Sequence, residues 1–110
     1  MRYLALACDF DGTLATSGTV SGDTRVALQR LRDSGRKIIL VTGRELEDLL
    51  AIFPDVEVFD RVVAENGGVV YRPVSREHKT LGEAPPAELI DALRARGISP
   101  LSVGYCLVAT

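Results

Sequence analysis

Apolar runs and helical patterns alternate along the first part of the chain. Residues 4–8, 37–41 and 59–64 are short apolar or β-branched runs, which is typical of strands. Between them, residues 24–31 and 46–53 carry apolar side chains at helical spacing. Strand, helix and strand in this order predict parallel strands joined by right-handed crossovers. The uninterrupted first run is typical of a sheet that is covered on both faces.

The rest of the chain shows a different pattern. An Asn-Gly pair at 66–67 lies between two β-rich runs and predicts a hairpin. Residues 72–84 are polar, contain Pro and Gly, and predict a linker. A Pro-Pro pair at 85–86 then opens a third helix that ends near Gly97, and the alternation over residues 101–107 predicts a last strand. That strand has no evident partner, which makes self-association through it a hypothesis.

Composition narrows the functional classes. The 110 residues have the length of one domain, with 46% hydrophobic and 25% charged residues. A formal charge of −2 gives no electrostatic reason to expect nucleic acid or an anionic membrane as a partner. No apolar stretch approaches the length of a membrane span, so we expect a cytoplasmic protein.

Two acidic residues follow the first predicted strand. Asp9 and Asp11 are two positions apart, so both carboxylates face one side and repel unless a cation or a shared proton lies between them. Mg²⁺ suits such oxygen ligands and usually also contacts a substrate phosphate. One carboxylate could then attack phosphorus while the other moves a proton. The alternative is a pair of acids that only caps the strand end. A calcium-binding loop fits poorly, because such a loop has glycine at its sixth position and Gly12 would be at the fourth.

The ends of the next two strands carry further polar residues. Thr42, Gly43 and Arg44 form a strand-to-helix turn, where a hydroxyl, free N–H groups and a guanidinium favour phosphate binding. Equally, Thr42 could serve only as a helix cap and Arg44 as a surface charge. Asn66 has two interpretations as well, a residue chosen for its turn conformation or a contact at the same rim as Asp9.

Taken together, these segments resemble the haloacid dehalogenase superfamily of phosphate-ester hydrolases. The motif Asp-Phe-Asp-Gly-Thr-Leu at 9–14 matches the first motif of that family, Val-Thr-Gly-Arg at 41–44 is similar to its second, and Ala-Glu-Asn-Gly-Gly at 64–68 is similar to the segment after its third strand. The resemblance is to the sugar-phosphate phosphatase-like branch, whose cap domain is inserted after the second motif. It covers roughly the first seventy residues.

The resemblance implies a fold and a division of the chain into two regions. The expected fold is α/β, an incomplete three-layer Rossmann-like parallel sheet with the start of an α+β cap. Residues 1–75 would form the amino-terminal part of the core, and residues 76–110 the linker and the beginning of the cap.

The resemblance also implies roles for single residues. Asp9 would be the nucleophile that forms an aspartyl-phosphate, and Asp11 would protonate the leaving oxygen and then activate water. Mg²⁺ would be held by the Asp9 carboxylate and the Asp11 main-chain oxygen. Thr42 would hydrogen-bond the transferring phosphoryl group. The other implied phosphate or substrate contacts are Gly12, Gly43, Arg44 and Asn66.

Two motifs of the family are missing from the sequence. We find neither the lysine that stabilises the phosphoryl charge nor the acidic stretch that completes the metal site. We therefore expect the amino-terminal part of a larger hydrolase, or a shortened relative, that is inactive alone. The leading hypothesis is a Mg²⁺-dependent phosphatase for a small phosphorylated metabolite such as a sugar phosphate. The alternatives are a phosphomutase and a non-catalytic module for phosphate binding or assembly.

Overall fold

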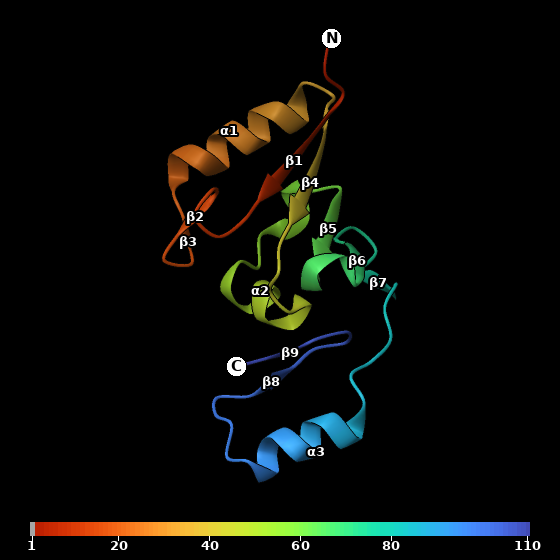
Figure 1. Cartoon of the computed structure of the whole chain (residues 1–110). Coiled ribbons are helices and arrows are strands. Elements are labelled where there is room, and N and C mark those ends of the chain that lie inside the picture. Colours follow the sequence, from red (N-terminus) through yellow and green to blue (C-terminus); the bar gives the residue numbers. More distant parts are fainter. Residues whose placement is uncertain (1) are drawn as a thin grey trace.

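The structure, a computed structural model, describes residues 2–110 and is built on one mixed sheet (Figure 1). The sheet has five strands in the order β1-β4-β5-β6-β7. β1 (Ala5–Asp9), β4 (Lys37–Val41) and β5 (Arg61–Ala64) are parallel neighbours. β6 (Val69–Arg72) and β7 (Glu77–Thr80) extend the sheet in antiparallel fashion. The predicted α/β class with a parallel centre is thereby confirmed.

Two helices connect the parallel strands. α1 (Gly22–Asp33) begins after Ser21, whose hydroxyl oxygen accepts a hydrogen bond of 3.2 Å from the main-chain N–H of Thr24. It is followed by Gly35, which has a φ of +89°, a backbone conformation that favours glycine. α2 (Leu46–Ile52) crosses from β4 towards β5. No helix formed by residues 2–110 is long and apolar enough to cross a membrane.

The core contains a row of three phenylalanines. Phe10, Phe53 and Phe59 are almost fully buried, with ring centroids 5.7 Å apart for the first pair and 6.3 Å for the second. The short 3₁₀ helix η1 (Val56–Val58) leads into this row. Phe10 follows the end of β1, so its burial fixes the acidic loop to the core.

The face of β1 is more exposed than expected. Leu4 and Leu6 are 69% and 43% exposed, whereas Leu40 in the neighbouring β4 is completely buried. The sequence predicts a strand that is covered on both faces, and this prediction is wrong for the described residues. The reason is packing: α1 packs mainly against β4 and not against β1, which lies at the edge of the sheet.

A small hairpin replaces the expected loop after the acidic segment. β2 (Ala15–Thr16) pairs with β3 (Thr19–Val20) in antiparallel fashion. The turn between them has positive φ at Ser17 (+52°) and Gly18 (+78°), which suits a tight hairpin. Ala15 and Val20 are both buried, so the hairpin is anchored in the core.

The predicted Asn-Gly hairpin is present. Asn66 and Gly67 have φ values of +57° and +95° in the short 3₁₀ turn η2 (Glu65–Gly67), and this turn joins the antiparallel β5 and β6. The predicted linker over residues 72–84 is partly wrong, since β7 belongs to this segment and pairs with β6. The proposed domain division after residue 75 stays a prediction.

The last part of the chain holds a helix and a hairpin. α3 (Ala87–Ala95) follows the proline pair as predicted, and Gly97 after it has a φ of +71°. β8 (Ser102–Val103) and β9 (Val108–Ala109) pair with one another, so the prediction of one strand over residues 101–107 is wrong. A turn interrupts it, in which Gly104 N–H donates to the Leu107 carbonyl oxygen at 2.8 Å. Figure 1 shows α3 and this hairpin at the opposite end of the molecule from α1. Self-association stays a prediction, but the unpaired terminal strand on which it was based is not present, because β8 and β9 pair with one another.

Candidate functional site

The carboxyl ends of three parallel strands meet at one edge of the sheet. In the register of the sheet, Asp9 is paired with Val41, and Val41 is paired with Val63. Asp9, Thr42 and the η2 turn therefore lie side by side, as the sequence predicts. In open α/β sheets, ligands bind beyond this edge.

A tight turn holds the acidic loop. The Phe10 carbonyl oxygen accepts hydrogen bonds from the main-chain N–H groups of Leu14 (3.0 Å) and Ala15 (2.9 Å). Gly12 has a φ of +75° and donates its N–H to the Ala15 carbonyl oxygen at 2.9 Å. The left-handed conformation explains glycine at this position. The Asp9 side chain stays exposed, with its Oδ1 accepting the Phe10 N–H at 2.9 Å.

Arg44 contacts Asp11 directly. Its Nε and Nη2 donate to the two carboxylate oxygens of Asp11, each at 2.8 Å, and its Nη1 donates to Asp48 at 2.8 Å. The hydrogen bonds from Arg44 hold the pKa of Asp11 below its usual range. In this arrangement Asp11 is ionised at neutral pH, and both of its carboxylate oxygens are occupied by Arg44. The sequence predicts Asp48 only as an acid in the first turn of a helix, and its pairing with Arg44 was missed, although a spacing of four residues is a known signal.

Thr42 is buried directly after β4, two residues before Arg44. Its side chain and backbone are 3% exposed, and its hydroxyl oxygen accepts the Arg44 N–H at 3.1 Å. Its own N–H donates to the Val63 carbonyl oxygen at 2.9 Å. Thr42 therefore organises the turn before α2, as the interpretation of Thr42 as a helix cap predicts. Its hydrogen bond to a phosphoryl group stays a prediction.

The loops after β4 and β5 are joined closely. The Glu65 N–H donates to the Arg44 carbonyl oxygen at 2.9 Å, and the Asn66 N–H donates to that of Thr42 at 3.3 Å. A Cβ atom at Gly43 would lie 2.8 Å from Asn66 Oδ1, so glycine allows this approach. Asn66 thus serves its turn and also lies at the rim with Gly43. A contact between Asn66 and a substrate stays a prediction.

The donors available to a cation are few at this edge. Within residues 2–110, no three His, Cys, Asp or Glu side chains are placed to hold a metal ion together. Mg²⁺ is commonly bound through one or two carboxylates, with water and substrate phosphate completing its shell. The carboxylate of Asp9 is exposed at this edge, and its role and that of the Asp11 main-chain oxygen as metal ligands stay predictions.

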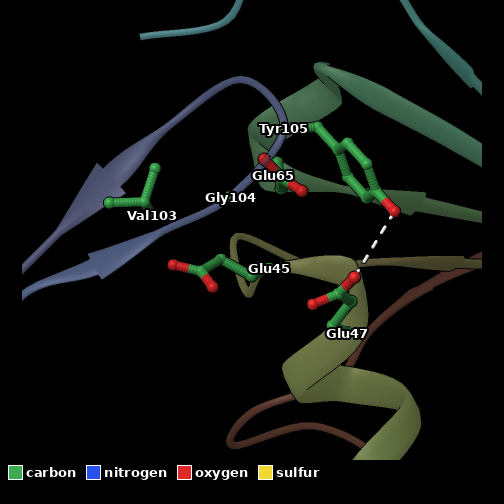
Figure 2. Close-up of a pocket in the computed structure, with 6 residues that line it drawn as sticks. All are labelled: Glu45, Glu47, Glu65, Val103, Gly104 and Tyr105. Atoms are coloured by element: carbon green, nitrogen blue, oxygen red, sulfur yellow. Dashed lines mark hydrogen bonds between the residues drawn. The ribbon is translucent and has the colours of Figure 1, made fainter. Parts of the chain in front are cut away.

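A second group of acids lies behind the same loops. Glu45, Glu47 and Glu65 line a cavity of about 130 Å³ together with Val103, Gly104 and Tyr105 (Figure 2). The sequence predicts Glu65 at the same rim as Asn66, and it predicts Glu45 and Glu47 only as acids in the first turn of a helix. The cavity depends on the β8–β9 hairpin, which packs against these loops and which the sequence analysis did not predict.

Comparison with known proteins defines the class. Residues 6–103 match the family model of haloacid dehalogenase-like hydrolases, and the chain belongs to this family. A solved haloacid dehalogenase-like hydrolase from Bacteroides thetaiotaomicron has the same fold, with a TM-score of 0.76 at 24% identity over 92% of this chain and 41% of that one. One from B. subtilis reaches a TM-score of 0.66 at 27% identity, over 84% of this chain and 32% of that one.

Among relatives, similarity extends to named phosphatases. A phosphoglycolate phosphatase of Halorubrum lacusprofundi is 39% identical over 97 residues, which are 86% of this chain and 40% of that protein. A 5-amino-6-(5-phospho-D-ribitylamino)uracil phosphatase of Bacillus subtilis is 36% identical over 76 residues, 64% of this chain and 26% of that protein. The chain thus spans less than half the length of these relatives. The family resemblance seen in the sequence is confirmed.

Proposed function

We propose that this protein is a Mg²⁺-dependent phosphatase that hydrolyses a small phosphorylated metabolite, such as a sugar phosphate, through an aspartyl-phosphate. The observation that carries the proposal is the meeting of Asp9, Asp11 and Thr42 at one sheet edge. Relatives that are named as phosphatases for small phosphorylated molecules support the substrate class. A cytoplasmic location and the lack of nucleic-acid or membrane partners remain predictions from composition.

The chemistry divides into two displacements. The exposed Asp9 carboxylate attacks phosphorus, the bond to the ester oxygen breaks, and the leaving oxygen takes a proton from Asp11. Asp11 then removes a proton from water, which attacks the acyl-phosphate and releases inorganic phosphate, restoring Asp9. Mg²⁺, held by the Asp9 carboxylate and the Asp11 main-chain oxygen, would neutralise phosphate charge.

Arg44 takes part in these two reaction steps. While the guanidinium holds both oxygens of Asp11, the carboxyl group is ionised and cannot donate a proton. A substrate phosphate offers the same bidentate acceptor geometry as a carboxylate and carries more charge. Transfer of Arg44 from Asp11 to the phosphate would both bind the substrate and release Asp11 for protonation.

A second candidate function is a module that binds phosphate without hydrolysing it. It is favoured by the small donor set at the sheet edge, because no three metal-ligating side chains within residues 2–110 come together. A phosphomutase shares the same first motifs and would transfer the phosphoryl group to a second hydroxyl instead of to water.

The test is hydrolysis of para-nitrophenyl phosphate by the 110-residue chain with and without Mg²⁺, compared with Asp9→Asn. Asp91→Asn removes the same charge from an exposed position on α3 and serves as control. Where the chain hydrolyses the ester, the release of inorganic phosphate should depend on Mg²⁺, be lost in Asp9→Asn and be kept in Asp91→Asn. Equal turnover in both variants would contradict the nucleophile assignment. Phosphate binding without turnover would favour the binding module.

A further inference from the structure

The cavity behind the phosphate-binding loops is lined by acids from two separate elements, the start of α2 and η2. Glu45 precedes α2, Glu47 lies in its first turn, and Glu65 lies in η2. Figure 2 shows the hairpin residues Val103–Tyr105 across from them, with the Tyr105 hydroxyl directed to Glu47 at 3.5 Å. Three carboxylates thus border the cavity where the hairpin meets the loops after β4 and β5.

Glu65 is buried in an unusual way for a carboxylate. The residue is 4% exposed, and its Oε1 accepts the Cys106 N–H at 2.8 Å. Its Oε2 and the Oε1 of Glu45 are buried and have no hydrogen-bond partner in the described structure. A buried carboxylate oxygen without a donor costs free energy, because it has lost its water and gained nothing in exchange.

No salt bridge within residues 2–110 involves these glutamates. The salt bridges formed by residues 2–110 join Arg25 to Asp55, Lys37 to Asp60, and Arg44 to Asp11 and Asp48. None of them reaches the three glutamates of the cavity. The cavity therefore holds acceptors that lack donors and negative charge that lacks a counterion.

The backbone is adapted to this arrangement. Glu65 has a φ of +53°, which is uncommon for a residue with a side chain. A Cβ atom at Gly104 would collide with the carboxylate of Glu65 and lie 3.0 Å from Glu45 Cγ. Glycine at 104 therefore lets the hairpin backbone lie directly against both glutamates and close one side of the cavity.

We propose that this cavity binds a small organic cation, a primary ammonium or guanidinium group, between Glu45 and Glu65. Each N–H donor satisfies one carboxylate oxygen, and a guanidinium offers several donors in a fixed fork. A bare metal ion fits less well, because no three ligating side chains within residues 2–110 converge on one point.

The size of the cavity agrees with such a ligand. Its volume is about 130 Å³, close to that of a cavity of ~150 Å³ that accommodates benzene. The ring of Tyr105 adds an aromatic wall, which suits a cation. The group could belong to an amine-bearing small molecule or to a Lys or Arg side chain. The site itself does not depend on the proposed phosphatase activity.

The experiment titrates the ¹⁵N-labelled 110-residue chain with methylguanidinium and follows the amide signals of Gly104 and Cys106. We expect saturable shifts that Glu65→Gln weakens about tenfold or more, because one charge-assisted hydrogen bond is lost. Gln at 65 keeps the acceptor for the Cys106 N–H and the shape of the side chain, and a dispersed amide spectrum shows that the variant is folded. Glu45→Gln is measured in the same way as a second, independent variant. Glu88→Gln, on the exposed surface of α3, controls for the loss of one charge.

The outcomes separate the ligand classes. Equal affinity for methylguanidinium in the wild type, Glu65→Gln and Glu45→Gln would overturn the proposal. So would saturation of the same amides by Mg²⁺ or Ca²⁺ with no response to methylguanidinium. The affinity for phosphoethanolamine, compared with the affinities for ethyl phosphate and methylammonium, shows whether the cation belongs to a small molecule or to a side chain. Tighter binding than either supports an amine on a phosphorylated small molecule, and binding equal to methylammonium supports a side-chain cation.

Discussion

Arg44 and Asp11, 33 residues apart in the sequence, form a bidentate ion pair with two N–O distances of 2.8 Å. One residue is the predicted phosphate clamp and the other the predicted proton-transfer group. Each satisfies the other in the structure, so neither is free for a substrate. The pair keeps the acidic loop after β1 against the loop after β4, and an arriving anion has to compete for it.

Replacement of Arg44 by Gln should raise the pKa of Asp11 towards its ordinary value of 3.8. The folded-state pKa of Asp11 is lowered, so the pair stabilises the fold fully above the unfolded value and loses this effect as pH falls through the folded value. Because the Asp11 side chain is 48% exposed, the stability difference at neutral pH should be at most about 1 kcal/mol. This stability difference between the wild type and Arg44→Gln should disappear as the pH falls and Asp11 becomes protonated.

The measurement for Arg44→Gln is a ¹³C NMR titration of the Asp11 carboxyl, combined with urea unfolding at several pH values. Asp48→Asn is the matched control, because it removes the other partner of Arg44 and leaves the pair with Asp11. We expect the pKa of Asp11 to stay low in this control. An unchanged Asp11 pKa in Arg44→Gln would contradict the ion pair.

Gly43 and Asn66 should be coupled energetically. Ala at 43 places its Cβ atom 2.8 Å from Asn66 Oδ1, so the amide has to move, at a cost of about 1–3 kcal/mol. Asn66→Gly removes the amide and keeps a residue that accepts a φ of +57°. In a double-mutant cycle followed by urea unfolding, Gly43→Ala should cost much less when Asn66 is already Gly. Additive costs would mean that the two loops do not touch.

Much of the sheet edge was predictable from the sequence. Apolar runs that end in Asp9 and Thr42 give parallel strands, and parallel strands place their carboxyl ends together. The Asn66 turn has a strong local signal as well. These features depend on local pattern and on topology, which a single sequence contains.

The side-chain pairings and the long-range packing could not be predicted in this way. Arg44 has several acceptors within reach of its long side chain, and its choice of Asp11 depends on the folded geometry. Leu6 is apolar like Leu40, yet it is exposed because α1 packs mainly against β4 and not against the edge strand β1. The burial of Glu65 depends on a hairpin from the end of the chain, and its two short strands carry little periodic signal.

That hairpin can be tested through Cys106. The thiol of Cys106 donates to the carbonyl oxygens of Gly68 (3.3 Å) and Gly82 (3.4 Å), so it is held where the hairpin meets the core. Gly104→Ala would drive a Cβ atom into the Glu65 carboxylate and lift the hairpin away.

In a Cys8→Ser background, where Cys106 is the one remaining thiol, we expect Gly104→Ala to raise the rate of labelling by Ellman's reagent several-fold. Thiol reactivity follows access once the thiol is released from its packed position. Gly22→Ala is the control, because a Cβ atom there meets nothing within 4 Å. Equal labelling rates in the two variants would show that residue 104 does not lie against Glu65. The cavity would then lose the side that the hairpin closes, and the cation site proposed between Glu45 and Glu65 would lose its structural basis.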